Sequence, residues 1–90
     1  IAMKLIIAIL RDIDHDAVSQ GLTTAGFRVT MIASTGGFWR RGNTTLLIGC
    51  EDEQVEHAIE LVRQNVSESA EPGTRHATIF VVKVDHYAHF

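Results

Sequence analysis

The sequence has few of the features that mark secreted, membrane-spanning or nucleic-acid-coating proteins. Cys50 is the only cysteine among 90 residues, so no internal disulfide can form, and we expect a reducing, cytoplasmic location. The apolar run from Leu5 to Leu10 is too short to span a membrane, and we recognise no signal peptide before it. The formal net charge of −3 argues against a non-specific nucleic-acid binder, which is normally basic.

The chain also lacks the residue groupings on which most catalytic and metal sites depend. We find no nucleophile–base pair and no paired-carboxylate motif, so an enzyme is the least expected class. The five histidines are dispersed, and Cys50 suits a small core residue better than a nucleophile. Asp12, Asp14 and Asp16 alternate like metal carboxylates, but no calcium-loop glycine or distal glutamate follows, so helix capping and surface charge explain them better. We therefore expect no metal and no cofactor.

The apolar pattern predicts four strands and two helices in one domain. Strands are expected at 4–10, 27–34, 44–50 and 77–84. A helix is expected at about 14–25, because mostly apolar residues recur at helical spacing from Ile13 to Ala25. A second helix is expected to begin in the acidic run 51–53, with a buried stripe that reaches Val66. Gly26 stands where a helix commonly ends in a left-handed residue. The polar stretch 67–76, which contains the only proline, is expected to be a loop.

This order, β-α-β-β-α-β, predicts the ferredoxin-like α+β arrangement, with one antiparallel sheet and both helices on the same face. The single domain is expected to cover residues 3–90, with Ile1 and Ala2 before Met3 as a cloning remnant. A 90-residue chain has a modest core, and one face of the sheet stays without helices. We therefore expect contacts between subunits on that face.

Residues 35–45, Thr-Gly-Gly-Phe-Trp-Arg-Arg-Gly-Asn-Thr-Thr, interrupt two apolar runs and combine features that suit a nucleotide. Paired glycines can expose backbone N–H groups to an anion, adjacent aromatic side chains can stack on a base, and adjacent arginines can neutralise phosphate. The residues concerned are Gly36, Gly37, Phe38, Trp39, Arg40 and Arg41. The stretch matches neither a Walker loop nor a dinucleotide fingerprint. From composition alone, a hairpin loop whose apolar tip packs on a neighbouring subunit remains an alternative.

Motifs along nearly the whole chain carry a resemblance to a known family. They are Met-Lys-Leu-Ile-Ile-Ala-Ile at 3–9, Phe-Arg-x-Thr at 27–30, Thr-Gly-Gly-Phe-x-Arg-x-Gly-Asn-Thr-Thr at 35–45, Ala-Thr-x-Phe-Val at 77–81 and Asp-x-x-x-x-Phe at 85–90. On these motifs the sequence resembles the PII-like cyclic di-AMP receptors, within the superfamily of the nitrogen regulatory protein PII. The resemblance implies a bacterial signal-transduction protein without known catalysis, built as a homotrimer of ferredoxin-like subunits with a ligand in each cleft between subunits.

The resemblance also implies a set of ligand-binding residues. Arg28 and Thr30 would lie beside the ligand, the glycine-rich stretch would surround a base, and an aromatic wall would come from the last strand. The full set is Arg28, Thr30, Gly36, Gly37, Phe38, Trp39, Asn43, Gly49, Phe80 and His89. The period of the second strand independently puts Arg28 and Thr30 on the same side.

Three positions depart from the family pattern. Gly26 replaces a common asparagine, His89 replaces a common glutamine, and the segment 67–76 is much shorter than the loop that the family usually carries there. The resemblance implies that such a loop reports the ligand to a protein partner. The alternatives to cyclic di-AMP binding are a trimeric binder of another adenine nucleotide (ATP, ADP or AMP) and a ligand-free trimeric scaffold.

Overall fold

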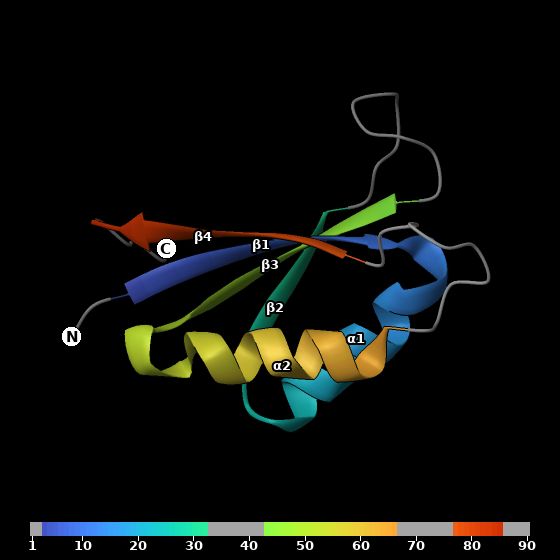
Figure 1. Cartoon of the computed structure of the whole chain (residues 1–90), viewed down its shortest axis with the longest axis horizontal. Coiled ribbons are helices and arrows are strands. Elements are labelled where there is room, and N and C mark those ends of the chain that lie inside the picture. The colour runs from blue at the N-terminus through green and yellow to red at the C-terminus, as the bar shows by residue number, and fades with distance from the viewer. Residues whose placement is uncertain (1–2, 33–42, 67–76, 86–90) are drawn as a thin grey trace.

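The computed structural model describes residues 3–32, 43–66 and 77–85, and it confirms the predicted ferredoxin-like fold (Figure 1). The elements along the chain are β1 (Met3–Arg11), α1 (His15–Thr24), β2 (Arg28–Ile32), β3 (Asn43–Glu51), α2 (Val55–Asn65) and β4 (Ala77–Val84). A short 3-10 turn precedes each helix, η1 (Asp12–Asp14) before α1 and η2 (Asp52–Gln54) before α2. Residues 35–42 of the predicted glycine-rich stretch 35–45, and the predicted loop at 67–76, lie outside the described residues.

The four strands form one sheet in the order β2-β3-β1-β4, and every neighbouring pair is antiparallel. Figure 1 shows α1 and α2 side by side on one face of this sheet. We call this the covered face, and the opposite side the open face. The described residues place no helix on the open face.

The core lies between the covered face and the two helices. Alternate residues of β1 and β3 point into it, because successive side chains of a strand face opposite sides. The fully or almost fully buried large side chains are Ile6, Leu10, Leu22, Leu46, Ile48, Val18 and Val62. Burial of each of these side chains stabilises the fold by about 1.5–3 kcal/mol relative to leaving it exposed. Cys50 is 4% exposed within this core, as the sequence predicted.

The end of α1 is fixed by a glycine. Gly26 has φ of +95°, a conformation that L-residues with side chains rarely adopt. The N–H of Gly26 donates to the carbonyl of Thr23, and the N–H of Phe27 donates to the carbonyl of Leu22, each at 3.0 Å. This double hydrogen bond is a Schellman motif, which confirms the predicted helix end and aims the chain into β2.

Two details at the start of α1 differ from the predictions. Ile13, expected on the buried stripe of the helix, is 76% exposed, because the 3-10 turn η1 rotates it away from the core. Asp14, considered as a helix cap, makes no side-chain capping bond. It is buried instead, at 3% exposure, and its carboxylate accepts hydrogen bonds from Arg11.

Candidate functional site

The described residues of the predicted ligand set gather on the open face. In the antiparallel register, Arg28 lies opposite Gly49, and Thr30 lies opposite Leu47. Residues directly opposite each other in an antiparallel pair point to the same side of the sheet. The buried residues Ile48 and Leu46 alternate with Gly49 and Leu47, so they point to the covered face. Arg28, Thr30 and Gly49 therefore share the open face.

The same register extends this face across the sheet. Leu47 pairs with Ile7 of β1, and Ile7 pairs with Phe80 of β4, so Phe80 is on the open face in the row of Thr30. Asn43 lies six residues before Gly49 in the same strand, which gives it the same orientation. Five residues of the predicted set are thus brought to one face: Arg28, Thr30, Asn43, Gly49 and Phe80. The other five, Gly36, Gly37, Phe38, Trp39 and His89, lie outside the described residues.

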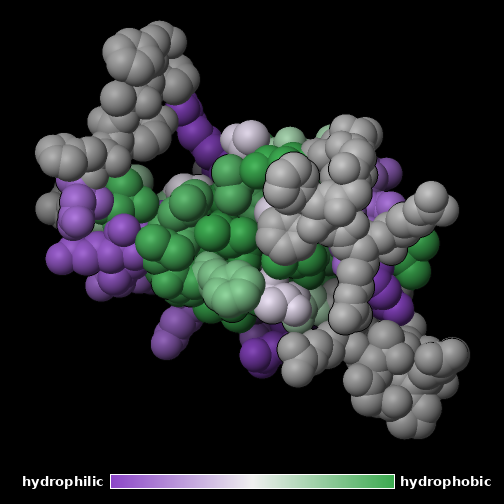
Figure 2. All heavy atoms as spheres, turned by 90° about the horizontal axis from the view of Figure 1, so that it is seen from above, coloured by the Kyte–Doolittle hydropathy of each residue, from purple (hydrophilic) through white to green (hydrophobic). Residues whose placement is uncertain are grey.

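The open face is apolar in its middle and polar at the β2 edge. Leu5, Ile7, Ile9 and Leu47 are half-buried, whereas Phe80 and Val82 are 53% and 45% exposed. Figure 2, which looks onto this face, shows apolar residues gathered at its centre with hydrophilic residues around them. Arg28 and Thr30 are both exposed on the outer strand β2. The face therefore offers apolar contact area beside a cation and a hydroxyl.

Gly49 makes a notch in this face. It is an exposed glycine inside a nine-residue strand, where glycine costs about 0.5–1 kcal/mol relative to alanine. A Cβ placed there meets no atom of the described residues within 4 Å, so packing against these residues does not demand glycine. Glycine in a strand often marks a place where a ligand or another backbone approaches closely. The notch lies between Arg28 and Leu5, which pair with Gly49 from either side.

Phe80 is far from Arg28 and Thr30 within one subunit. The first lies on β4 and the other two on β2, which are the two outer strands of the sheet. Three strand intervals of about 4.8 Å separate them, or about 14 Å in total. Phe80 and Arg28 of one subunit therefore cannot both contact the same base.

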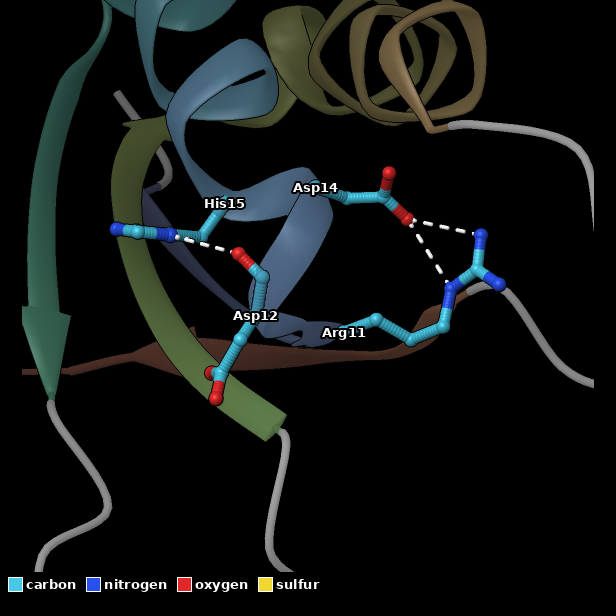
Figure 3. A network of polar contacts seen from close by, with 4 residues as sticks. All are labelled: Arg11, Asp12, Asp14 and His15. Carbon is cyan, nitrogen blue, oxygen red and sulfur yellow. Dashed lines mark hydrogen bonds and ion pairs between the residues drawn. The ribbon is translucent and has the colours of Figure 1, made fainter.

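A polar cluster occupies the end of the sheet where β1 ends and β3 begins (Figure 3). Arg11 donates from Nε and Nη2 to Oδ2 of Asp14 at 3.2 and 3.1 Å. Nδ1 of His15 lies 3.0 Å from the carbonyl oxygen of Asp12. The hydroxyl of Thr44 donates to the Asp12 carboxylate. Sequence reasoning missed this cluster, since no local pattern joins Asp12 to a residue 32 positions later.

The remaining candidates from the sequence are the Cys50 thiol and a metal site. Burial, with a smaller contribution from the Asp52 carboxylate, raises the pKa of the Cys50 thiol, so the thiolate nucleophile is disfavoured. Among residues 3–32, 43–66 and 77–85 there is no group of three His, Cys, Asp or Glu side chains that could hold a metal ion. Neither described helix is long and apolar enough to cross a membrane.

Comparison with known proteins gives two findings. The sequence model of a family described as cyclic-di-AMP receptor matches residues 3–71. The chain is also similar to a solved structure described as a functionally unknown protein from Pediococcus pentosaceus ATCC 25745, with a TM-score of 0.82 and 34% sequence identity over 99% of this chain and 98% of the other. The family match contains Arg28, Thr30, Asn43 and Gly49, whereas Phe80 and His89 lie beyond it. The chain therefore belongs to the cyclic-di-AMP receptor family.

Proposed function

We propose that the protein is a signal-transduction receptor that binds cyclic di-AMP on its open face, in clefts between the subunits of a homotrimer. The observation that carries the proposal is the grouping of Arg28, Thr30, Asn43 and Gly49 on one face of a chain in this family. A receptor family argues for a binding protein and against an enzyme. The ligand-binding contribution of Gly36, Gly37, Phe38, Trp39 and His89 is part of the same proposal and follows from the resemblance.

The chemistry of the ligand fits the described residues. Cyclic di-AMP carries two phosphates, which need cations or N–H donors, and Arg28 supplies an exposed guanidinium. Its adenines need hydrogen-bonding partners at their edges, which the Thr30 hydroxyl and the Asn43 amide can supply. The notch at Gly49 lets the ligand approach the backbone between these groups. Phe80 offers an aromatic surface on which a base can stack, worth about 1–3 kcal/mol.

The apolar surface of the open face supports the proposed trimer. Large, contiguous apolar surface is unusual on a monomer and commonly marks an interface. Here the centre of the open face is apolar, with half-exposed Phe80 and Val82 continuing it onto β4. Because Phe80 is about 14 Å from the Arg28 strand within a subunit, the simplest complete site pairs Arg28 of one subunit with Phe80 of the next. Each site then needs two copies of the chain.

The position of Gly26 affects which ligand is preferred. Gly26 ends α1 at positive φ, a place that asparagine also tolerates, so the replacement of the usual asparagine leaves the fold intact and removes a side-chain amide. Fewer polar contacts would be offered to a base near this position. ATP, AMP and cyclic di-GMP are therefore the ligands against which cyclic di-AMP must be compared.

Calorimetric titration with these four nucleotides tests the proposal. We expect tight binding of cyclic di-AMP alone, weakened about tenfold to a hundredfold by Arg28→Ala, since a charge-assisted contact contributes about 1.5–3 kcal/mol. Arg63→Ala is the matched control, because Arg63 is also exposed but lies on α2 beside Glu60. A response to ATP or AMP without one to cyclic di-AMP would reassign the ligand, and no response to any nucleotide would favour the scaffold.

Light scattering coupled to size exclusion tests the assembly. We expect about three times the 9.9 kDa mass of the chain. A monomer at micromolar concentration would contradict every site built between subunits.

A further inference from the structure

We propose that the hydroxyl of Thr45 is a further ligand contact, which hydrogen-bonds the polar edge of an adenine on the open face. This inference rests on the function proposed above and adds one residue to the proposed site. Thr45 is a nearly buried polar side chain in an apolar part of that face, and the described residues supply its hydroxyl with no hydrogen-bond partner.

The strand register places the Thr45 side chain on the open face. Thr45 of β3 pairs with Ile9 of β1 and with Ile32 of β2, so these three side chains form one row across the sheet. The adjacent Thr44 points to the covered face, where its hydroxyl donates to the carboxylate of Asp12. Two neighbouring threonines of one strand therefore face opposite sides, and only one of the two hydroxyls has a partner within the described residues.

Thr45 is 5% exposed, although no described helix lies over the open face. Its side chain is short, whereas Ile9 and Ile32 on either side of it are longer, so the hydroxyl lies below the ends of its neighbours. Ile32 is 43% exposed, and Leu47, the next residue of β3 on this face, is half-buried. The hydroxyl is thus a recessed polar group with apolar side chains around it.

The hydroxyl of Thr45 is available to a partner from outside the subunit. Among the described residues no fully buried side-chain nitrogen or oxygen lacks a hydrogen bond, so the Thr45 oxygen retains contact with the surface. Polar groups this close to full burial are normally hydrogen-bonded, and one that is not carries an unfavourable free energy. A ligand that bonds to this hydroxyl therefore gains an interaction without breaking one inside the fold.

The position of Thr45 suits the base of a nucleotide. Thr30 lies opposite Leu47, so it is the diagonal neighbour of Thr45, at about 7–8 Å. Gly49 and its partner Arg28 lie four residues along β3, or about 13 Å away. With a phosphate at Arg28, the base extends toward the two threonines. A hydroxyl both donates and accepts, which matches the amine and the ring nitrogens of an adenine edge.

The test compares the two adjacent threonines, which are almost equally buried at 5% and 7% exposure. Thr45→Val removes the hydroxyl and nearly keeps the shape, whereas Thr45→Ser keeps the hydroxyl. Thr44→Val is the matched control, because it removes a hydroxyl that bonds on the covered face. The readouts are cyclic di-AMP affinity by calorimetry, the midpoint of thermal unfolding, and the mass in solution by light scattering.

We expect Thr45→Val to weaken cyclic di-AMP binding about tenfold, as for one lost hydrogen bond, and to leave the unfolding midpoint and the mass unchanged. Thr44→Val should do the reverse, with a lower midpoint and an affinity within about twofold of wild type. Thr45→Ser should keep nearly all of the affinity. The 2′-deoxy analogue of cyclic di-AMP should lose the same factor with Thr45→Val, because the contact is to the base and not to the ribose.

Wild-type affinity in Thr45→Val, or an equal loss in Thr45→Ser or Thr44→Val, overturns the inference while the proposed function stands. A lower midpoint or a smaller mass for Thr45→Val would give the hydroxyl a role in the fold or between subunits, and would overturn it too. A loss that disappears with the 2′-deoxy analogue would place the contact on the ribose and contradict the adenine assignment. If the wild-type protein does not bind cyclic di-AMP, the proposed function fails and this inference falls with it.

Discussion

The two faces of the sheet are built from the same strands and have different uses. On the covered face, Ile6, Ala8, Leu46 and Ile48 are completely buried beneath the helices. On the open face, Arg28, Thr30 and Gly49 are exposed beside half-buried apolar side chains. Adjacent residues of one strand face opposite sides of the sheet, so they differ more in exposure than residues at the two ends of the strand. The comparison predicts that substitutions on the covered face change folding, whereas those on the open face change binding.

The largest expected effect is on the covered face. Ile48→Ala should lower the free energy of unfolding by about 2–5 kcal/mol, because it opens a cavity in a filled core. Leu47→Ala, one residue earlier on the half-buried side, should cost clearly less. Denaturant unfolding under identical conditions measures both. Equal losses for the two variants would remove the distinction between the faces.

Arg28→Ala tests the open face, where we expect an effect on binding rather than on folding. Cyclic di-AMP affinity should fall about tenfold to a hundredfold, and the dependence of binding on salt should flatten, because a phosphate contact is lost. The free energy of unfolding should change by no more than about 0.5 kcal/mol, as is usual for an exposed position. Titrations at two salt concentrations provide the measurement, and an unchanged salt slope would place the phosphate elsewhere.

Gly49→Val tests whether the notch serves the ligand. A Cβ at this position meets no atom of the described residues within 4 Å, and valine suits a strand, so folding should persist. Binding should weaken by about 1 kcal/mol or more, because the side chain occupies the space beside Arg28. Calorimetry combined with thermal unfolding separates the two effects. Unaltered affinity would show that the glycine has another purpose.

The smallest effect is expected at Cys50, which is on the covered face. Cys50→Ala should cost about 1 kcal/mol of stability, the usual size for a core truncation of one atom, and leave affinity unchanged. The raised pKa predicts slow alkylation of the native thiol near neutral pH and fast alkylation after unfolding. A binding loss above tenfold in the alanine variant would indicate a liganding or reactive thiol.

Much of this architecture could be predicted because its signals are local. Period-two and helical patterns determine the element order, and the glycine at position 26 marks the end of α1. The shared side of Arg28 and Thr30 also follows from period alone. Their alignment with Gly49 and Phe80 was inferred only through the resemblance, because strand register depends on pairing between distant segments.

The errors arose in the turn before α1, and the omission arose at a contact between distant segments. Asp14 has the residue type of a helix cap, yet the guanidinium of Arg11 takes its carboxylate into a partly buried pair. Ile13 fits the helical stripe, yet a 3-10 turn occupies its position and exposes it. The contact between Thr44 and Asp12 joins two polar residues that no sequence period relates.

The most direct test of the account uses two neighbouring methyl groups on β2. Thr30 and Met31 are adjacent and both exposed, but they point to opposite faces of the sheet. In a methyl NMR titration with cyclic di-AMP, the Thr30 resonance should shift in proportion to site occupancy while the Met31 resonance stays nearly constant. A shift of Met31 without one of Thr30 would place the ligand on the wrong face and contradict the account.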